Sequence, residues 1–357
     1  MVLLTESKAL AKVKPKIATM TELSEAIGIS RPTLSRYFQD PSTVRSSTSK
    51  KIRKRLEEVD YVYNFLATRQ NRKTKGLIGV IIPHYTDLFF ASMLEAIERA
   101  AQDTGFTVIT QSSKGTAQGE SQAVSRLRSM RADGAIIAPL GFESSTEVFQ
   151  LASEDFPIVF ADSRPAHPIA GADFVGTDNA QSIAAIVGYL CRTADAPIFL
   201  GMPDLNSNAS EREQAYVSKI KELRLEPRFV KAEGASPSWQ FEAYGFGVMD
   251  KHFSHQRHIT DTILCANDRI AIGAIRAANK YGLFARGSDR EGSLRIAGHD
   301  DHPLSQYMFP AITTAAQDIE GIGEDTVRLL LERIRGERKS APISLNKEAA
   351  IRIREST

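Results

Sequence analysis

Polar side chains stand directly after several short apolar runs of this chain. They are Asp162 and Arg164 after residues 157–161, Asn267 after 262–266, Asp300 and Asp301 after 294–298, and Arg212 at a helix start beyond 197–201. Carboxylates and amides accept hydrogen bonds from hydroxyl groups in pairs, and arginine donates a two-pronged pair. This set of residue types favours the binding of a small molecule that carries several hydroxyl groups, such as a sugar.

A second kind of chemistry is indicated by the stretch "ISRPTLSRYF" at residues 29–38, which contains Arg31 and Arg36. An arginine can donate two parallel hydrogen bonds to O6 and N7 of guanine, and it also pairs with phosphate. A second group of basic residues could reach a phosphate backbone, namely Lys50, Lys51, Arg53, Lys54 and Arg55. Ordinary solvated helix charges remain the alternative interpretation of all of them.

Catalytic and metal-binding patterns are not evident. The sequence shows no phosphate-binding glycine loop, no nucleophile elbow and no carboxylate pair with an independent signal. Its two cysteines, Cys191 and Cys265, lie in apolar runs without metal-ligand spacing, which favours reduced thiols in the cytoplasm. We therefore expect no enzyme activity, no cofactor and no metal.

Short helices must position the two arginines. A helix from Thr19 or Thr21 should end at Gly28, because glycine readily takes the left-handed conformation that stops a helix. Ser30 is a good N-cap for the next helix, and Pro32 falls in its first turn, where a missing N–H is harmless. Apolar spacing then predicts an inward face of Leu34, Tyr37 and Phe38, and in a third helix of Ile52, Leu56 and Val59. The three helices predict a helix-turn-helix domain.

From Gly76 onward, short apolar runs alternate with amphipathic helical segments. The runs are 77–82, 106–111, 134–139, 157–161, 173–177, 197–201, 228–232, 262–266 and 294–298. Such alternation predicts an α/β fold with parallel, doubly wound sheets covered by helices on both faces. About 280 residues exceed one comfortable core, so we expect two such lobes.

Charge is unevenly divided along the 357 residues. Residues 1–75 hold 16 Lys and Arg against 7 Asp and Glu, whereas the remainder holds 29 against 36. This asymmetry indicates a basic module that binds a polyanion, joined to an acidic body, although a disordered basic tail would also be basic. No stretch provides the roughly 18 apolar residues of a membrane helix, and the N-terminus lacks the pattern of a secretory signal.

Several motifs, in order, resemble the LacI/GalR family of bacterial transcription regulators. They are "ISRPTLSRYFQDP-STVRSSTSKKI", "GLIGVIIPHYTDLFF", "VGTDNAQSIAA", "CANDRIAIGAIRA", "IAGHDD" and "PAITTAAQDIEGIG". The resemblance covers nearly the whole chain. It implies a small all-α helix-turn-helix domain followed by a two-lobed core like that of periplasmic sugar-binding proteins, with the ligand between the lobes.

The resemblance also implies a division of the chain. The DNA-binding domain would span 1–60, a hinge 61–75 and the effector-binding core 76–357, with lobe crossings near Gly176, Gln317 and Gly336. The N-lobe would then hold about 76–176 and 318–336, and the C-lobe about 177–317 and 337–357.

For DNA, the resemblance places Arg31 and Pro32 at the positions that vary most with operator sequence. Arg31 would carry most of this readout, since Pro32 has no side-chain donor or acceptor. In the hinge, Tyr63 replaces the family's proline and Gln70 its wedging leucine, and the polar Gln70 cannot serve as an apolar wedge. Docking of a hinge helix in the minor groove through hydrogen bonds of Arg69 or Gln70 remains open. The expected DNA-binding residues are Ser30, Arg31, Pro32, Thr33, Ser35, Arg36, Lys50, Arg53, Asn64, Arg69 and Gln70.

For the effector, the resemblance implies a site in the inter-lobe cleft. Its expected residues are Phe89, Phe90, Asp162, Arg164, Arg212, Asn267, Asp300, Asp301 and Gln317. Either phenylalanine would supply an apolar face, and Gln317 would lie at a crossing. Trp239 falls near a family aromatic position but about three residues from it, and ordinary packing explains it equally well.

We therefore expect a cytoplasmic, ligand-responsive DNA-binding repressor that acts as a homodimer on a near-palindromic operator, with a tetramer left open. The effector would be a sugar or a similar molecule, and no membrane partner is expected. The alternatives are a solute-binding protein of the periplasmic type, which should have a signal sequence and a neutral N-terminus, and an enzyme on the same scaffold.

Overall fold

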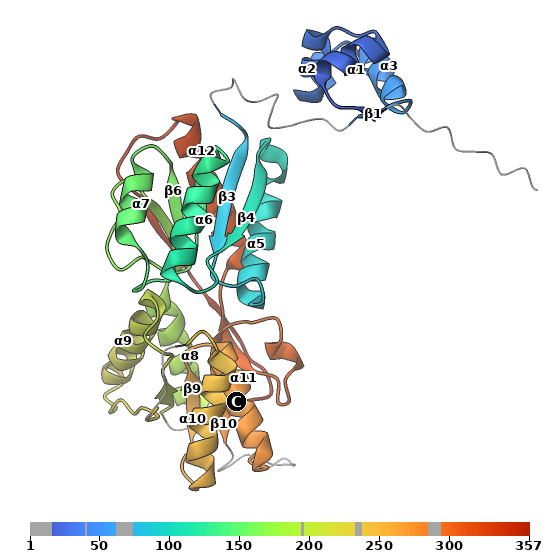
Figure 1. Ribbon diagram of the computed structural model, residues 1–357. Helices are drawn as coiled ribbons and strands as arrows, with labels where there is room; N and C mark the ends of the chain where they lie inside the picture. The colour runs from blue at the N-terminus through green and yellow to red at the C-terminus, as the bar shows by residue number, and fades with distance from the viewer. Residues whose placement is uncertain (1–15, 40, 62–73, 194–195, 233–237, 285–293) are drawn as a thin grey trace, which may run out of the picture. The chain divides into compact units, whose positions relative to one another are not determined.

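The computed structural model describes residues 16–39, 41–61, 74–193, 196–232, 238–284 and 294–357, and these divide into two compact units, 1–75 and 76–357 (Figure 1). The first unit is small and largely helical. Its elements are β1 (Lys16–Ile17), α1 (Met20–Ile27), α2 (Arg31–Gln39), the 3-10 turn η1 (Pro41–Thr43), α3 (Ser46–Leu56) and β2 (Asp60–Tyr61), with β1 and β2 paired in parallel.

Local signals set the helix boundaries of this unit. Thr19 caps α1 by accepting a hydrogen bond from the N–H of Glu22 at 3.2 Å, and Gly28 ends it with a φ of 63°. Leu34 and Tyr37 of α2 are buried against Leu23, Ile27 and Ile52, whereas Phe38 is half-buried. The helix-turn-helix prediction is confirmed, and the core it builds leaves Arg31 and Arg36 exposed.

The second unit contains two α/β lobes, each built on one sheet. The N-lobe sheet has the order β12-β7-β6-β5-β3-β4, and every pair in it is parallel. Its strands are β3 (Leu77–Ile82), β4 (Thr107–Ser112), β5 (Gly134–Ile137), β6 (Ile158–Ala161), β7 (Asp173–Thr177) and β12 (Ser344–Lys347). Its helices are α5 (Leu88–Ala101), α6 (Ala117–Ser129), α7 (Thr146–Ser153) and α12 (Ile319–Arg335), and the turn η2 (Gln102–Thr104) follows α5. Every residue of β3 is buried, as a central parallel strand requires.

The C-lobe sheet has the order β13-β11-β10-β9-β8, and only β13 among these runs antiparallel to its neighbour. Its strands are β8 (Ile198–Leu200), β9 (Thr262–Cys265), β10 (Arg295–Asp300), β11 (Thr313–Ala316) and β13 (Ala350–Arg352). Its helices are α8 (Asn179–Thr193), α9 (Ser207–Glu222), α10 (Phe241–Ser254) and α11 (Asp268–Lys280), and the turn η3 (Ser305–Tyr307) precedes β11. The expected α/β class with two doubly wound sheets is confirmed.

The chain passes between the lobes three times (Figure 1). The first two passages lie between β7 and α8 and between β11 and α12. The third lies at 348–349, between β12 and β13, and not near Gly336 as predicted. Gly336 instead ends α12 in the left-handed conformation, with a φ of 73°, and the chain then adds β12 to the N-lobe before crossing.

One predicted strand is not formed. Residues 228–232 contribute a single bridge between Phe229 and Phe199 beside β8. Two backbone hydrogen bonds, from Phe199 N–H to the carbonyl of Arg228 and from Val230 N–H to the carbonyl of Phe199, hold this segment beside the edge strand β8, but the pairing does not continue into a strand. The prediction was wrong because the apolar residues of this segment pack at the edge of the sheet without forming a strand.

Candidate effector site

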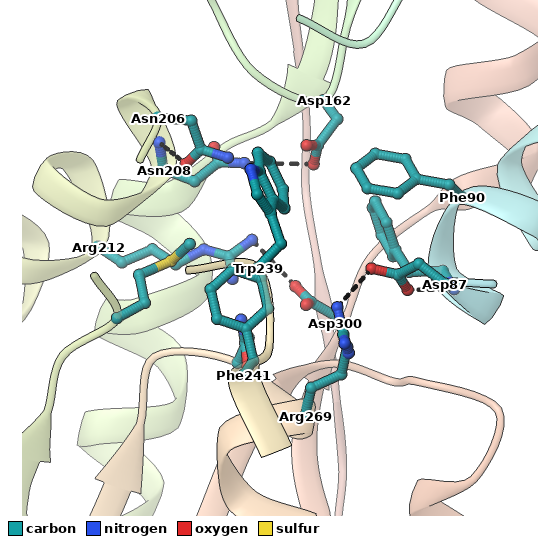
Figure 2. Close-up of a pocket in the computed structure, with 13 residues that line it drawn as sticks. Asp87, Phe90, Asp162, Asn206, Asn208, Arg212, Trp239, Phe241, Arg269 and Asp300 are labelled. Carbon is teal, nitrogen blue, oxygen red and sulfur yellow. Dashed lines mark hydrogen bonds and ion pairs between the residues drawn. The ribbon is translucent and has the colours of Figure 1, made fainter. Parts of the chain in front are cut away.

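A cavity between the two lobes gathers charged and aromatic side chains (Figure 2). Its free volume is about 30 Å³, enough for one or two water molecules and too small for a sugar without lobe movement. The lining residues are Asp87, Phe89, Phe90 and Asp162 from the N-lobe, and Met202, Asn206, Asn208, Arg212, Trp239, Phe241, Asn267, Arg269 and Asp300 from the C-lobe.

The deepest charge in the cavity is Arg212, which is only 3% exposed. Arg212 lies on α9. The side-chain oxygen of Asn206 caps this helix by accepting a hydrogen bond from the N–H of Asn208 at 3.1 Å. Its Nη2 contacts Asp300 Oδ1 at 2.9 Å, while Nη1 donates to the carbonyl of Ala266 at 2.8 Å. The guanidinium is therefore already neutralised and held in place by the protein.

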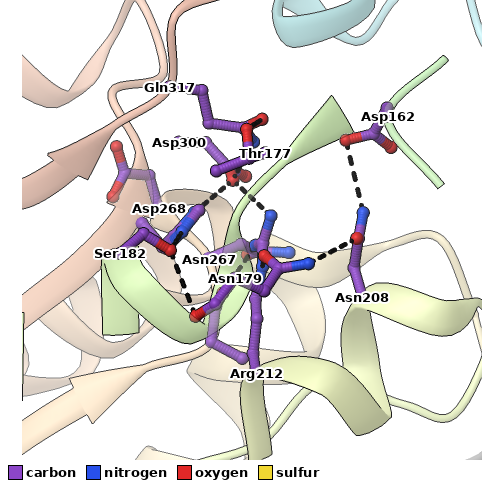
Figure 3. A network of polar contacts seen from close by, with 12 residues as sticks. Asp162, Thr177, Asn179, Ser182, Asn208, Arg212, Asn267, Asp268, Asp300 and Gln317 are labelled. Atoms are coloured by element: carbon purple, nitrogen blue, oxygen red, sulfur yellow. Dashed lines mark hydrogen bonds and ion pairs between the residues drawn. The ribbon is translucent and has the colours of Figure 1, made fainter. Parts of the chain in front are cut away.

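Asp300 ends β10 in a left-handed conformation with a φ of 111°, and three donors meet at its Oδ1 (Figure 3). Besides Arg212, these are Nδ1 of His299 and Nε2 of Gln317, both at 2.8 Å. Burial would raise the pKa of Asp300, but the Arg212 charge and these donors hold it below its usual value. Burial lowers the pKa of His299 to about 4, so the imidazole is neutral at pH 7.

Asp162 is the carboxylate least compensated by cations among the cavity residues. It follows β6 with a φ of 65°, is buried, and accepts one hydrogen bond, from Nδ2 of Asn208 at 3.2 Å. Burial raises the pKa of Asp162 to about 7. A chain of hydrogen bonds continues from Asn208 through Asn179 to Arg212 (Figure 3). Asp162 of the N-lobe is therefore connected to the C-lobe through hydrogen bonds.

The other arginine of the cavity, Arg269, forms a bond between the two lobes. Arg269, near the start of α11, donates to Asp87 Oδ2 at 2.8 Å and makes a two-pronged contact with Glu242, each bond 2.7 Å long. Asp87 belongs to the N-lobe, where its other oxygen caps α5 through the N–H of Phe89. Burial raises the pKa of Asp87, and the Arg269 charge opposes that shift. Asp87–Arg269 is thus an ion pair across the cleft.

Aromatic rings form an apolar wall of the cavity. Phe89 and Phe90 meet edge-to-face with centroids 5.2 Å apart, and Phe90 lies 6.5 Å from Trp239. Trp239 in turn meets Phe241 at 5.8 Å, and Arg269 lies over the Phe241 ring. Such rings offer flat faces to the C–H face of a sugar or to a heterocycle.

The structure brings six of the nine expected effector residues to the cavity. These are Phe89, Phe90, Asp162, Arg212, Asn267 and Asp300. Asn267 also caps α11 by accepting from the N–H of Ile270 at 2.8 Å, which fixes the position of its side-chain amide.

The other three lie elsewhere. Gln317 stands behind Asp300, linking it to the hydroxyl of Thr177 at the first lobe crossing. Asp301 pairs with Arg354 at 2.6 Å, away from the cavity. Arg164 stacks on the Phe174 ring at 3.5 Å and donates to Ser344 and Asn346 of β12, so its side chain lines a separate pocket.

Sequence reasoning missed several cavity residues, namely Asp87, Met202, Asn206, Asn208, Phe241 and Arg269, and left Trp239 undecided. Asp87, Asn206 and Arg269 all lie at or next to helix starts that follow a strand. The same rule that identified Arg212 and Asn267 would have found them if it had been applied to every such helix start.

The expected DNA-binding residues of the first unit form an open surface. Arg31, Pro32, Arg36, Lys50 and Arg53 are exposed. Ser30 precedes α2, and its hydroxyl is bonded to that of Thr33 at 2.8 Å; Thr33 and Ser35 are half-buried. Asn64, Arg69 and Gln70 lie outside the described residues, so the structure says nothing of the expected hinge contacts.

In the described part of the chain, no group of three or more His, Cys, Asp or Glu side chains is placed to hold a metal ion. Among the helices of the same residues, none is both long and apolar enough to cross a bilayer.

Fold and site together define a class: a helix-turn-helix module joined to a two-lobed core with a polar inter-lobe cavity. The periplasmic binding protein domain model matches residues 78–338, and a helix-turn-helix model matches 14–63. The chain is 26% identical to the transcriptional repressor CytR of Escherichia coli K12 over 332 residues, which cover 92% of this chain and 93% of that protein. It is 24% identical to the regulator GntR of the same strain, covering 91% and 94%.

Solved structures show the same fold. The Lac repressor bound to ONPG matches with a TM-score of 0.78 and 23% identity, covering 96% of this chain and all of that one. The complex of the regulator CelR with cellobiose matches at 0.67 and 19%, covering 95% and 99%. The chain belongs to the LacI family of DNA-binding transcription regulators, and its relatives are regulators and not enzymes.

Proposed function

We propose that this protein is a ligand-responsive repressor that binds an operator as a homodimer and a sugar or sugar-like effector in the inter-lobe cavity. The observation that carries the proposal is the Asp87–Arg269 contact at 2.8 Å, which joins the lobes across a cavity lined by carboxylates, amides and aromatic rings. A ligand that inserts between the lobes must alter this contact. It can therefore shift the balance between two lobe arrangements by its differential affinity for them.

DNA recognition is assigned to α2 and α3. Arg31 lies at the first position of α2, where a recognition helix presents side chains to base edges in the major groove. Arg36 on the same helix and Lys50 and Arg53 on α3 are exposed and would contact phosphates. On this proposal residues 1–60 bind DNA, 61–75 form the hinge, and the rest responds to the effector in the cytoplasm.

Dimer formation is assigned to the exposed apolar loop after β10. Tyr307 and Phe309 are each 78% exposed, which is unusual for large apolar side chains on an isolated surface. A Lac repressor dimer bound to operator matches this chain with a TM-score of 0.76. A second copy of the chain is the partner we propose for this loop.

The test is a binding measurement on DNA. Purified protein is titrated with the DNA upstream of its own gene and with bulk DNA at several salt concentrations, with and without candidate sugars. We expect tight, salt-dependent binding to a near-palindromic site and a change in affinity with one class of sugar. Equal affinity for upstream and bulk DNA would overturn the proposal, and would leave a solute-binding protein as the better reading.

A further inference from the structure

Among the described residues that line the inter-lobe cavity, no cation is free to meet an anionic ligand. Its two guanidinium groups, Arg212 and Arg269, are each engaged by carboxylates. Arg212 is bonded through three of its nitrogens, to Asn179, Ala266 and Asp300. A carboxylate or phosphate on a ligand would have to break such a pair and leave a buried charge behind.

Arg269 is even more fully compensated. It faces two carboxylates, Asp87 at 2.8 Å and Glu242 at 2.7 Å, so one positive charge is shared between two negative ones. The Phe241 ring covers its face at 5.2 Å. Arg269 and its two carboxylates therefore carry a net negative charge, and the guanidinium has no free pair of N–H donors for an anion.

The carboxylates, in contrast, have oxygens to spare. Within the described part of the chain, the Asp162 side chain accepts one hydrogen bond at Oδ1, from Asn208, and meets no cation in an ion pair. Asp300 receives all three of its donors at Oδ1. Their remaining oxygens can accept from hydroxyl or ammonium groups, and the aromatic wall around Phe90 and Trp239 favours a ligand with an apolar or cationic face.

We infer that the cavity selects an uncharged or cationic hydroxylated ligand, such as a neutral sugar, an amino sugar or a nucleoside, and rejects sugar acids and phosphorylated sugars. Asp162 is the residue that sets this selection, because it is the cavity carboxylate without a cationic partner among the described residues. The inference rests on the proposed function, since it concerns the effector of that same site.

The test uses full-length protein and matched probe sets. Each set contains one parent, namely glucose, galactose, mannose, ribose or adenosine, together with its available amino, carboxylate and phosphate derivatives. Binding is measured at millimolar concentration by thermal shift and then by calorimetry. We expect the best ligand to be a neutral or amino member, at least about tenfold tighter than the anionic member of its set.

Two isosteric variants assign the effect to residues. At pH 8, above the pKa of about 7 that burial gives Asp162, Asp162→Asn should reduce the preference for amino over neutral members about tenfold while keeping neutral binding, because the amide retains an acceptor and loses the charge. Asp300→Asn should relax the rejection of anions, because it frees the Arg212 charge. The matched control is Asp155→Asn, which changes an exposed carboxylate of the N-lobe that pairs with Arg128. This control should leave the affinities for all probe ligands unchanged.

Each failure points to a different cause. An anionic member that binds best, or the absence of binding by every set, overturns the inferred ligand class. An unchanged preference in Asp162→Asn overturns the role of that residue. DNA binding is measured on the same samples without any ligand, so loss of the proposed function would be seen separately from failure of the ligand panel.

Discussion

At the scale of single residues, the cavity is organised by which carboxylate each arginine meets. Arg212 pairs with Asp300 inside the C-lobe, whereas Arg269 reaches Asp87 in the N-lobe. The first pair therefore shapes the site, and the second couples it to lobe position. Removing Asp300 would leave the buried Arg212 charge uncompensated, which is costly, whereas Arg269 would keep Glu242 if Asp87 were removed.

We expect Asp87→Asn to favour an open arrangement of the lobes. The change removes the charge that meets Arg269 across the cleft, while Asn can still cap α5. The radius of gyration of the core from small-angle scattering should increase, and amide exchange around residues 87–93 should become faster.

Glu242→Gln is the matched control for this change. Glu242 meets the same guanidinium, but both residues belong to the C-lobe, so the bond does not span the cleft. The control should leave the radius of gyration unchanged. Equal opening in both variants would show that the lobe arrangement depends on compensation of the Arg269 charge and not on the bond between the lobes.

Arg31→Ala should weaken binding at one or two operator positions selectively. Loss of a two-pronged contact to guanine costs about 1–3 kcal/mol at the base that it reads. Because Arg31 is exposed, the melting temperature should hardly change. Affinities for a set of single-base operator variants provide the measurement, with Arg55→Ala of α3 as control. Uniform weakening across all sequences would assign Arg31 to phosphate instead.

At the scale of elements, helix α6 supports the N-lobe loop after β5, which contacts the C-lobe. Glu120 of α6 is buried and accepts from the N–H of Leu140 at 2.9 Å. Two residues on, the N–H of Phe142 donates to the carbonyl of Leu205 in the C-lobe. Burial raises the pKa of Glu120 to about 7, so its protonation affects the support of an inter-lobe loop.

The Glu120 carboxyl makes stability pH-dependent in a definite direction. Its pKa is higher in the folded than in the unfolded chain, so the folded state binds the proton more tightly. Its contribution to the free energy of unfolding therefore falls as pH rises from about 4.5 to about 7 and stays low above that. Glu120→Gln should stabilise the protein at pH 8 by on the order of 1–3 kcal/mol and much less at pH 5. Chemical denaturation at both pH values measures this; an equal effect at both would contradict it.

At the scale of the whole molecule, the chain joins a basic unit to an acidic one. Residues 1–75 carry a net charge of +9 and the remainder −7. Binding to DNA through the basic unit should release counterions, so the affinity should fall steeply with salt.

Arg53→Ala should reduce the slope of log K against log salt by about one unit, because Arg53 is exposed on α3 and is assigned to a phosphate. The ratio of operator to bulk DNA affinity should be preserved. Lys221→Ala, an exposed charge of the acidic unit, serves as control and should leave the slope unchanged. A changed ratio with an unchanged slope would assign Arg53 to a base.

The double change Tyr307→Ser and Phe309→Ser should shift the protein toward monomers and weaken operator binding. Both side chains are exposed, so the fold of the C-lobe should survive their loss. Sedimentation at several concentrations measures the association constant. Leu151→Ser, an exposed apolar residue on α7, is the control. An unchanged sedimentation profile would place the dimer contact elsewhere.

The amino-acid sequence by itself determined the elements and the class of this protein. Gly28 ends α1 and an unbroken apolar run forms β3, since capping and strand burial depend on a few consecutive residues. The ends of apolar runs in the sequence also indicated Asp162 and Asp300. Segments whose role depends on a distant neighbour were misjudged, such as the edge segment 228–232 and the crossing expected near Gly336.

Only the tertiary structure decided which charges meet. Asp87 and Arg269 are 182 positions apart in the chain, and their contact exists because α5 and α11 begin at facing ends of two different sheets. The same packing turned Arg164 away from the cavity and brought Trp239 into it. Residue types along a chain show which groups are available for binding. Which of them remain unpaired, and so available to a ligand, depends on long-range packing that no local pattern records.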